Sequence, residues 1–185
     1  MAGPQPFVQI SQQHLDEMQY YVAKVGTTAS ALRNQGGSGL VSTAIGFLSS
    51  IDLKQLAGHT TATYRQWLDT QTIAVMGQFP VKNLWGPARK VVNIFMVMAS
   101  LNIFLRTAYG LDRFENVLEV PLDITVVKKL RKFGRAQKIF PRGAFPKWNG
   151  IKWLTQPDSD KHQQIADAMS NHLGVPRGRL DVVLF

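Results

Sequence analysis

The sequence predicts an all-α protein folded as a single domain over residues 1–185. Apolar residues recur every three or four positions along several segments, which is the spacing of one face of a helix. No segment alternates apolar and polar residues in the manner of a β-strand, and no internal repeat is visible. With 185 residues, of which 45% are hydrophobic, the chain is long enough to bury a sizeable core.

Three helices are expected in the N-terminal part. Ser11 is placed to cap the first, which continues to about Lys24 with apolar positions in helical spacing. The sequence QGGSG at 35–39 predicts a flexible break, because glycine disfavours a helix. A short helix over 40–48 and a longer one over 61–76 follow.

A long central helix is expected after the connector at residues 78–86, where proline and glycine break regular structure. The segment from Pro87 to about Ala108 is apolar on nearly all sides, which is typical of a buried helix. Gly110 is expected to end it.

Asp123 follows Val120-Pro121-Leu122 and is placed as the N-cap of a helix that continues to Phe133. The other elements expected in the C-terminal part are one or two helical turns at 111–118, a loop at 134–157, a helix from Asp158 to about Leu173, and a short helix started at Pro176.

The net charge of +9 lies entirely in residues 82–185, which hold 17 of the 21 basic residues and 8 of the 12 acidic ones. Residues 128–152, which we call the basic segment, carry nine basic residues and no acidic one. The aromatic residues Phe133, Phe140, Phe145 and Trp148 lie among them. A solubilising surface usually mixes both signs of charge, whereas a one-signed cluster is typical of contact with a phosphate backbone. The segment therefore favours nucleic acid as the partner.

Several function classes are excluded or disfavoured. The chain has no cysteine, so disulfides, thiolate metal sites and a thiol nucleophile are excluded. The four histidines show no ligand spacing, and neither a metal nor a cofactor is expected. No signal-peptide pattern begins the sequence, and the apolar run at 91–105 is shorter than a membrane span. We therefore expect a cytoplasmic monomer with no membrane partner.

The sequence LWGPARK at 84–90 predicts a tight turn that opens the central helix. Such a turn presents backbone N–H groups and the positive end of the helix dipole to a phosphate, with Arg89 and Lys90 beside it. Without further information, Lys90 reads as a solvated lysine at a helix start and Asp123 as a purely structural N-cap.

The two segments together resemble the helix–hairpin–helix DNA glycosylase superfamily, in which a hairpin of the form L-P-G-V-G-x-K is followed by V-P-V-D. The matching residues here are LWGPARK at 84–90 and VPLD at 120–123. The 33-residue interval from Lys90 to Asp123 and the ending GVPRGRLDVVLF at 174–185 are closest to the archaeal 8-oxoguanine glycosylase branch. Four residues after the lysine, however, Ile94 stands where that branch keeps a phenylalanine.

The resemblance implies a helical bundle of two small lobes with a cleft between them. Residues 1–81 would form N-terminal helices and part of the base pocket, 82–133 the hairpin and catalytic segment, and 134–185 the basic loop and C-terminal helices. It also implies a DNA N-glycosylase with AP lyase activity, acting in repair or in defence against phage. Its substrate would be double-stranded DNA carrying an 8-oxoguanine-type or hypermodified base.

By the same resemblance, Lys90 would attack the sugar C1′ and form a Schiff base, and Asp123 would stabilise positive charge on the sugar. A neutral amine is the reactive form of lysine, and burial near a cation favours it. Contacts to DNA are expected from Gly86, Ala88, Arg89, Lys128, Arg135, Lys138, Arg142, Lys147 and Trp148. Two alternatives stay open: a non-catalytic helix–hairpin–helix DNA-binding protein, and a helical module whose basic face binds an acidic protein.

Overall fold

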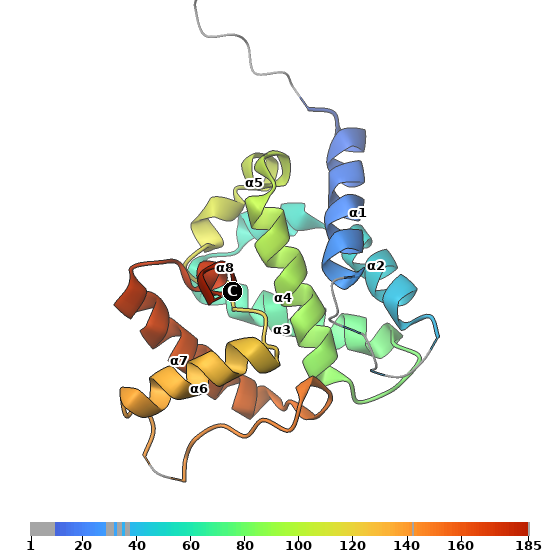
Figure 1. Ribbon diagram of the computed structural model, residues 1–185. Coiled ribbons are helices and arrows are strands. Elements are labelled where there is room, and N and C mark those ends of the chain that lie inside the picture. Colours follow the sequence, from blue (N-terminus) through green and yellow to red (C-terminus); the bar gives the residue numbers. More distant parts are fainter. Residues whose placement is uncertain (1–9, 29–31, 33–34, 36–37, 142, 185) are drawn as a thin grey trace, which may run out of the picture.

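The computed structural model describes residues 10–28, 32, 35, 38–141 and 143–184. All regular structure in these residues is helical, which confirms the predicted all-α class (Figure 1). Arg142, the N-terminal MAGPQP and residues 36–37 of the predicted break at 35–39 lie outside the described residues. The α-helices are α1 Gln12–Thr28, α2 Leu40–Ser50, α3 Thr61–Gln78, α4 Trp85–Leu101, α5 Ile103–Tyr109, α6 Ile124–Ala136, α7 Gln156–Leu173 and α8 Leu180–Leu184. The 3-10 helices are η1 Leu53–Gly58, η2 Leu111–Phe114, η3 Ile151–Trp153 and η4 Arg177–Arg179.

The first apolar cluster is built around α4, against which α1 and α3 pack. Its buried residues run from Leu15 to Leu118 along the chain. Val92 and Phe95 of α4 are fully buried in it, as the nearly continuous apolar sequence of this helix predicts. Helix α4 is thus the central element of the first apolar cluster, and the other helices of this cluster cover it.

The predicted helix from Pro87 to Ala108 is wrong in its length, because the chain bends by 92° between α4 and α5. Asn102 causes the break: its side-chain Oδ1 accepts hydrogen bonds from the backbone N–H groups of Phe104 and Leu105, both at 3.1 Å. An asparagine that caps a new helix in this way competes with continuation of the old one. Gly110 ends α5 in the left-handed conformation, as predicted, with φ of 60°.

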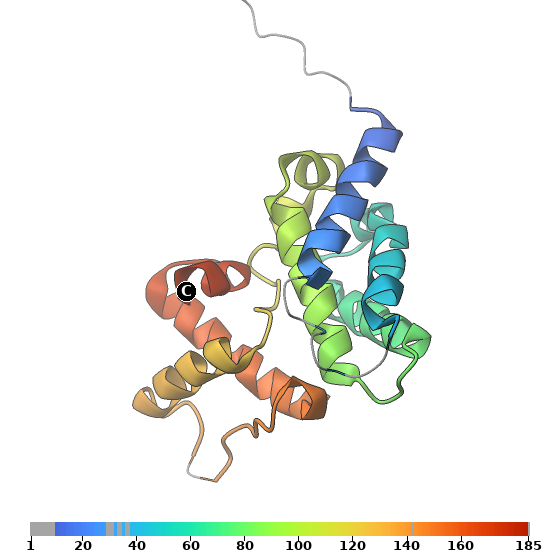
Figure 2. The same ribbon diagram turned by 45° about the vertical axis from the view of Figure 1, so that its right-hand side comes forward.

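The second apolar cluster is formed by α6, α7 and α8, with buried residues from Val120 to Leu184. In Figure 2 these helices, in gold to red, lie together on one side and the blue and green helices on the other, joined by the yellow connector. Helix α7 begins one turn earlier than predicted, because Thr155 accepts a hydrogen bond from the backbone N–H of Asp158 and is the N-cap. Asp158 lies in the first turn instead.

Among the described residues, no single helix is long and apolar enough to cross a membrane. Helices α4 and α5 reach the required length and hydropathy only as a bent pair, and α4 is almost entirely buried inside the protein.

Candidate active site

The start of α4 differs from the predicted phosphate-binding turn. The helix begins at Trp85, so Gly86 and Ala88 lie in its first turn and both are buried. The backbone N–H of Ala88 donates to the carbonyl of Leu84 at 3.0 Å, so this amide is not available to a phosphate. The expected contacts of Gly86 and Ala88 with DNA therefore do not fit their positions.

Gly86 instead allows η3 to lie directly on α4. A Cβ atom at this position would be 2.1 Å from the carbonyl oxygen of Ile151 and 2.9 Å from Cβ of Leu154, distances that no side chain tolerates. The absence of a side chain brings the loop before α7 against the helix turn that precedes Lys90.

Lys90 is almost completely buried, with 7% of its surface exposed. Burial lowers the pKa of its amine, and the nearby charge of Asp123 opposes this effect. The side chain is thus no solvated lysine at a helix start, and a larger fraction of its amine is neutral than on a free lysine.

Asp123 is the N-cap of α6, as the sequence predicts. Its Oδ1 accepts hydrogen bonds from the backbone N–H groups of Thr125 at 2.8 Å and Val126 at 2.9 Å. Both bonds use the same oxygen, and within the described residues no hydrogen bond reaches Oδ2. Because the side chain is only partly buried, the second oxygen is available to a ligand.

Lys90 and Asp123 line the same hollow, which has a volume of about 670 Å³; we call it the active-site hollow. Its other walls are the start of α6 and the loop that precedes η3, from Ile124, Thr125, Trp148, Asn149, Gly150 and Ile151. No ion pair joins Lys90 to Asp123 among the described contacts. Lys90 and Asp123 therefore line one hollow without forming an ion pair at close range.

In the described part of the chain, no residue before Lys90 contributes to the walls of this hollow. The base pocket was expected to involve residues 1–81, and here the structure differs. Ile94, one turn after Lys90, points to α1 instead, since its Cγ2 lies 3.0 Å from where a Cβ of Gly26 would be. The N-terminal helices therefore pack against α4 and do not line the active-site hollow in the described part of the chain.

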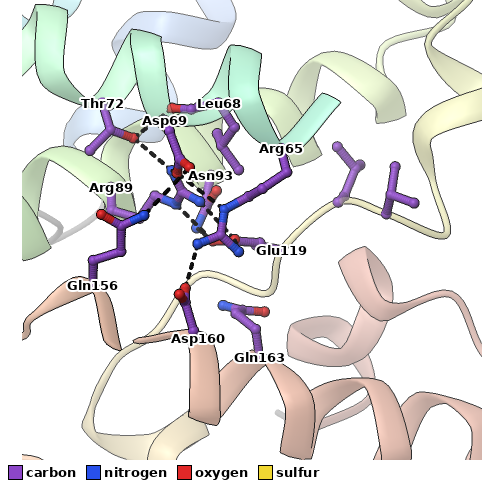
Figure 3. A network of polar contacts seen from close by, with 12 residues as sticks. Arg65, Leu68, Asp69, Thr72, Arg89, Asn93, Glu119, Gln156, Asp160 and Gln163 are labelled. Carbon is purple, nitrogen blue, oxygen red and sulfur yellow. Dashed lines mark hydrogen bonds and ion pairs between the residues drawn. The ribbon is translucent and has the colours of Figure 1, made fainter. Parts of the chain in front are cut away.

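Arg89 is placed where it cannot contact DNA, contrary to expectation: only 1% of it is exposed. Its Nε and Nη2 donate to the two carboxylate oxygens of Glu119, both at 2.8 Å, and its Nη1 donates to Asp69 at 2.7 Å (Figure 3). Such a bidentate pair satisfies both charges inside the protein. Arg89 thus has carboxylate partners, whereas its neighbour Lys90 forms no ion pair among the described residues.

Glu119 is the centre of a polar network that joins α3, α4, α7 and the connector before α6 (Figure 3). It also accepts from Asn93 at 3.0 Å and pairs with Arg65 at 3.1 Å, and Arg65 in turn pairs with Asp160 of α7. Burial alone would raise the pKa of Glu119, but the hydrogen bond and charge of Arg89, with the charge of Arg65, lower it. This network ties the two apolar clusters together next to the active-site hollow.

Sequence reasoning missed Glu119 and Asn93, although both lie near motif residues. A glutamate four residues before Asp123 and an asparagine inside an apolar helix are the available signals, because buried polar residues require partners. The partner of Arg89 is 30 positions away, so no local pattern identifies it.

The basic segment is largely exposed and electrically unpaired. None of its eight described basic side chains forms an ion pair; all the ion pairs in the described part involve other residues. Lys128, Arg135, Lys138 and Lys147, which were expected to contact DNA, are all exposed. Arg142 lies outside the described residues.

The tryptophans of the basic segment and of η3 differ in exposure. Trp148 lines the active-site hollow, is partly buried and contacts the ring of His162 edge-on, with ring centres 5.9 Å apart. Trp153 of η3, by contrast, is 67% exposed.

The described residues contain no group of three or more histidine or acidic side chains that could hold a metal ion. What the hollow offers is a buried amine of lowered pKa and a carboxylate with one oxygen available. A lysine in this state can act as a nucleophile or form a Schiff base, and a fixed carboxylate can stabilise a developing positive charge.

Comparison of the chain with protein-family models, with curated proteins and with solved structures gave no match.

Proposed function

We propose that the protein is a DNA N-glycosylase with AP lyase activity, in which Lys90 is the nucleophile and Asp123 the stabilising carboxylate. The observation that carries this proposal is the active-site hollow, where a buried lysine and a carboxylate that form no described ion pair line one space of about 670 Å³. The helix–hairpin–helix glycosylase-like fold, with two lobes and a cleft between them, is part of the proposal. The two separate apolar clusters support it.

In the proposed reaction, the neutral amine of Lys90 attacks C1′ of the target nucleotide. The bond from C1′ to the base nitrogen breaks, and its electron pair leaves with the base. While this bond breaks, positive charge develops on the sugar, and Asp123 stabilises it because its carboxylate is held in place by the N-terminus of α6. The nitrogen then loses its two protons, one to the departed base and one to O4′ as the bond from C1′ to O4′ breaks, and the C1′–nitrogen double bond of the Schiff base forms. Elimination of the 3′ phosphate from this Schiff base cleaves the strand.

The target base is inside the stack in duplex DNA, so the nucleotide must be extruded to reach the hollow. The unpaired cations of the basic segment supply the attraction for the backbone. The excised base is proposed to be an oxidised purine of the 8-oxoguanine type or a hypermodified base of the kind found in phage DNA.

Base release tests the proposal. Duplexes carrying oxidised, deaminated, alkylated or glucosylated bases are incubated with the protein, and free bases are identified by mass spectrometry. We expect one class to be released, with a loss of at least a hundredfold in rate for Lys90→Gln and for Asp123→Asn. Asparagine caps helices as well as aspartate does, so Asp123→Asn removes the charge and keeps the cap.

Lys54→Gln is the matched control, because Lys54 is exposed, lies in η1 and forms no ion pair within the described contacts. Its rate should equal that of the unmodified protein. Tight duplex binding by all variants with no base released from any substrate would refute the proposed activity, and would favour the non-catalytic DNA-binding alternative.

A further inference from the structure

A second hollow, with a volume of about 450 Å³, lies at the opposite end of α6 from Asp123. It is lined by Arg135 and Lys138, by the apolar side chains Phe140, Pro141 and Phe145, and by Gly143. The thirteen residues of α6 rise by about 20 Å, at 1.5 Å per residue. Phe145 of this hollow and Trp148 of the active-site hollow are only three residues apart, so the facing walls of the two hollows lie within about 11 Å of each other. We call the second hollow the distal hollow.

The distal hollow is a built feature of the loop that follows α6. Arg131 donates to the carbonyl of Pro146 at 2.8 Å, and Lys161 of α7 donates to the carbonyl of Ala144 at 3.2 Å, so the loop is held on both sides of Phe145. A Cβ on Gly134 would be 3.0 Å from Phe145, which shows how closely the ring packs on α6. Lys138 adopts the left-handed conformation, with φ of 52°, where the chain turns away from the helix.

Its chemistry combines aromatic rings with cations that have no carboxylate partner. Phe140 and Phe145 meet edge-on, with ring centres 5.9 Å apart, and the guanidinium groups of Arg131 and Arg135 each lie 5.7 Å from the Phe145 ring. Neither Arg135 nor Lys138 forms an ion pair in the described part of the chain. Aromatic faces next to basic side chains are how proteins bind unpaired nucleotides, with the base against a ring and the phosphate on a cation.

We propose that the distal hollow binds an unpaired nucleotide of the DNA strand held at the active-site hollow. A phosphate alone would leave most of a 450 Å³ space empty and would make no use of the rings. A base that is still paired inside a duplex presents only its edge, so it does not fill the hollow. The assignment of the strand to this DNA rests on the proposed function, whereas the nucleotide chemistry of the distal hollow does not.

The spacing gives the position of that nucleotide. Separations between about 11 Å and 20 Å correspond to about three to six base pairs at 3.4 Å per step. DNA with single-stranded bases about three to six pairs from the target should therefore reach both hollows at once.

Equilibrium binding tests the proposal without depending on catalysis. Lys90→Gln protein is titrated with fluorescein-labelled duplexes that carry a tetrahydrofuran abasic analogue three, four, five or six pairs from one end. Two test duplexes each end in an overhang of three thymidines, one as a 5′ overhang and the other as a 3′ overhang. In the comparison duplex for each, the three thymidines are paired with three adenosines. We expect one of the overhangs to bind at least fivefold tighter than its paired counterpart, despite carrying fewer phosphates.

The preference should fall to within twofold in Arg135→Ala and in Phe140→Leu, and should persist in Lys54→Ala. Arg135 is exposed, so its variant is informative even if Phe140→Leu does not fold. A preference that survives in Arg135→Ala would overturn the proposal, and so would equal binding of overhang and paired duplexes when free thymidine monophosphate does not bind either. Equal binding of the duplexes, together with binding of free thymidine monophosphate that depends on Arg135, would overturn only the assignment to a strand. This experiment measures binding by the Lys90→Gln variant and does not depend on base release. The absence of an overhang preference is therefore a different result from the absence of base release.

Discussion

Lys90 and its neighbour Arg89 show that adjacent positions on a helix can place two basic side chains in different environments. Arg89 points into the protein and forms two hydrogen bonds to Glu119, whereas Lys90 is buried at the wall of a hollow and has no ion-pair partner among the described residues. The local sequence is sufficient to predict Asp123 as an N-cap, because capping depends on neighbours in the chain. The same local information misplaces Arg89, because its partner is 30 residues away.

The lowered pKa of Lys90 has a consequence for the rate of the proposed strand cleavage. Only the neutral amine forms a Schiff base, and its fraction increases as the pH rises through the pKa. Since burial lowers that pKa from the ordinary value of 10.5, the cleavage rate of abasic-site DNA should reach half its plateau below pH 10.5. The measurement is a pH profile of strand cleavage under single-turnover conditions.

The Asp123→Asn variant tests the direction in which the charge of Asp123 shifts the pKa of Lys90. The charge of Asp123 raises the pKa of Lys90 against the effect of burial, so its removal should move the midpoint of the profile to lower pH. A midpoint at or above 10.5, or a shift to higher pH in this variant, would contradict the electrostatic picture.

At the scale of elements, the contact between α4 and η3 shapes the active-site hollow. The sequence indicates that Gly86 breaks the connector, whereas the structure uses it for close approach of Ile151 within a helix that has already begun. The bend at Asn102 is a similar case, since the apolar pattern continues through it and only the capping geometry reveals the break. Hydrophobic periodicity predicts which segments are helical, but boundaries depend on single side chains.

Gly86→Ala should therefore destabilise the protein by about 1–3 kcal/mol, the usual cost of forcing extra atoms into a packed contact. Gly46→Ala is the matched control, because Gly46 lies within α2 and a Cβ there meets no atom within 4 Å. That control should gain roughly 0.5–1 kcal/mol from the helix preference of alanine. Urea denaturation measures both, and equal effects would show that the contact with η3 is not tight.

At the scale of the whole molecule, the network around Glu119 holds the two apolar clusters in one arrangement. It connects α3 and α4, which belong to the first cluster, with α7 of the second. Lys90 and Asp123 lie on elements of different clusters, so their separation depends on this connection. The sequence predicts the helices and the positive charge of the C-terminal half, but the pairing of charges across the clusters follows only from the fold.

Arg89→Met is expected to destabilise the protein by about 3–5 kcal/mol, because it leaves the charge of Glu119 buried without its main partner. Adding Glu119→Gln should restore part of the loss. Arg106→Met breaks a more exposed ion pair with Glu115 and should cost about 1 kcal/mol or less. Thermal and urea unfolding compare the three; equal costs for Arg89→Met and Arg106→Met would contradict the role of the buried network.

The central claim is that the amine of Lys90 forms a covalent bond with the sugar of DNA. Reductive trapping tests it most directly: an abasic-site duplex is incubated with the protein and borohydride, the adduct is digested, and the modified residue is located by mass spectrometry. We predict a single adduct on Lys90, formed equally by Lys54→Gln and lost in Lys90→Gln. An adduct on any other amine, or trapping that persists in Lys90→Gln, would contradict the assignment.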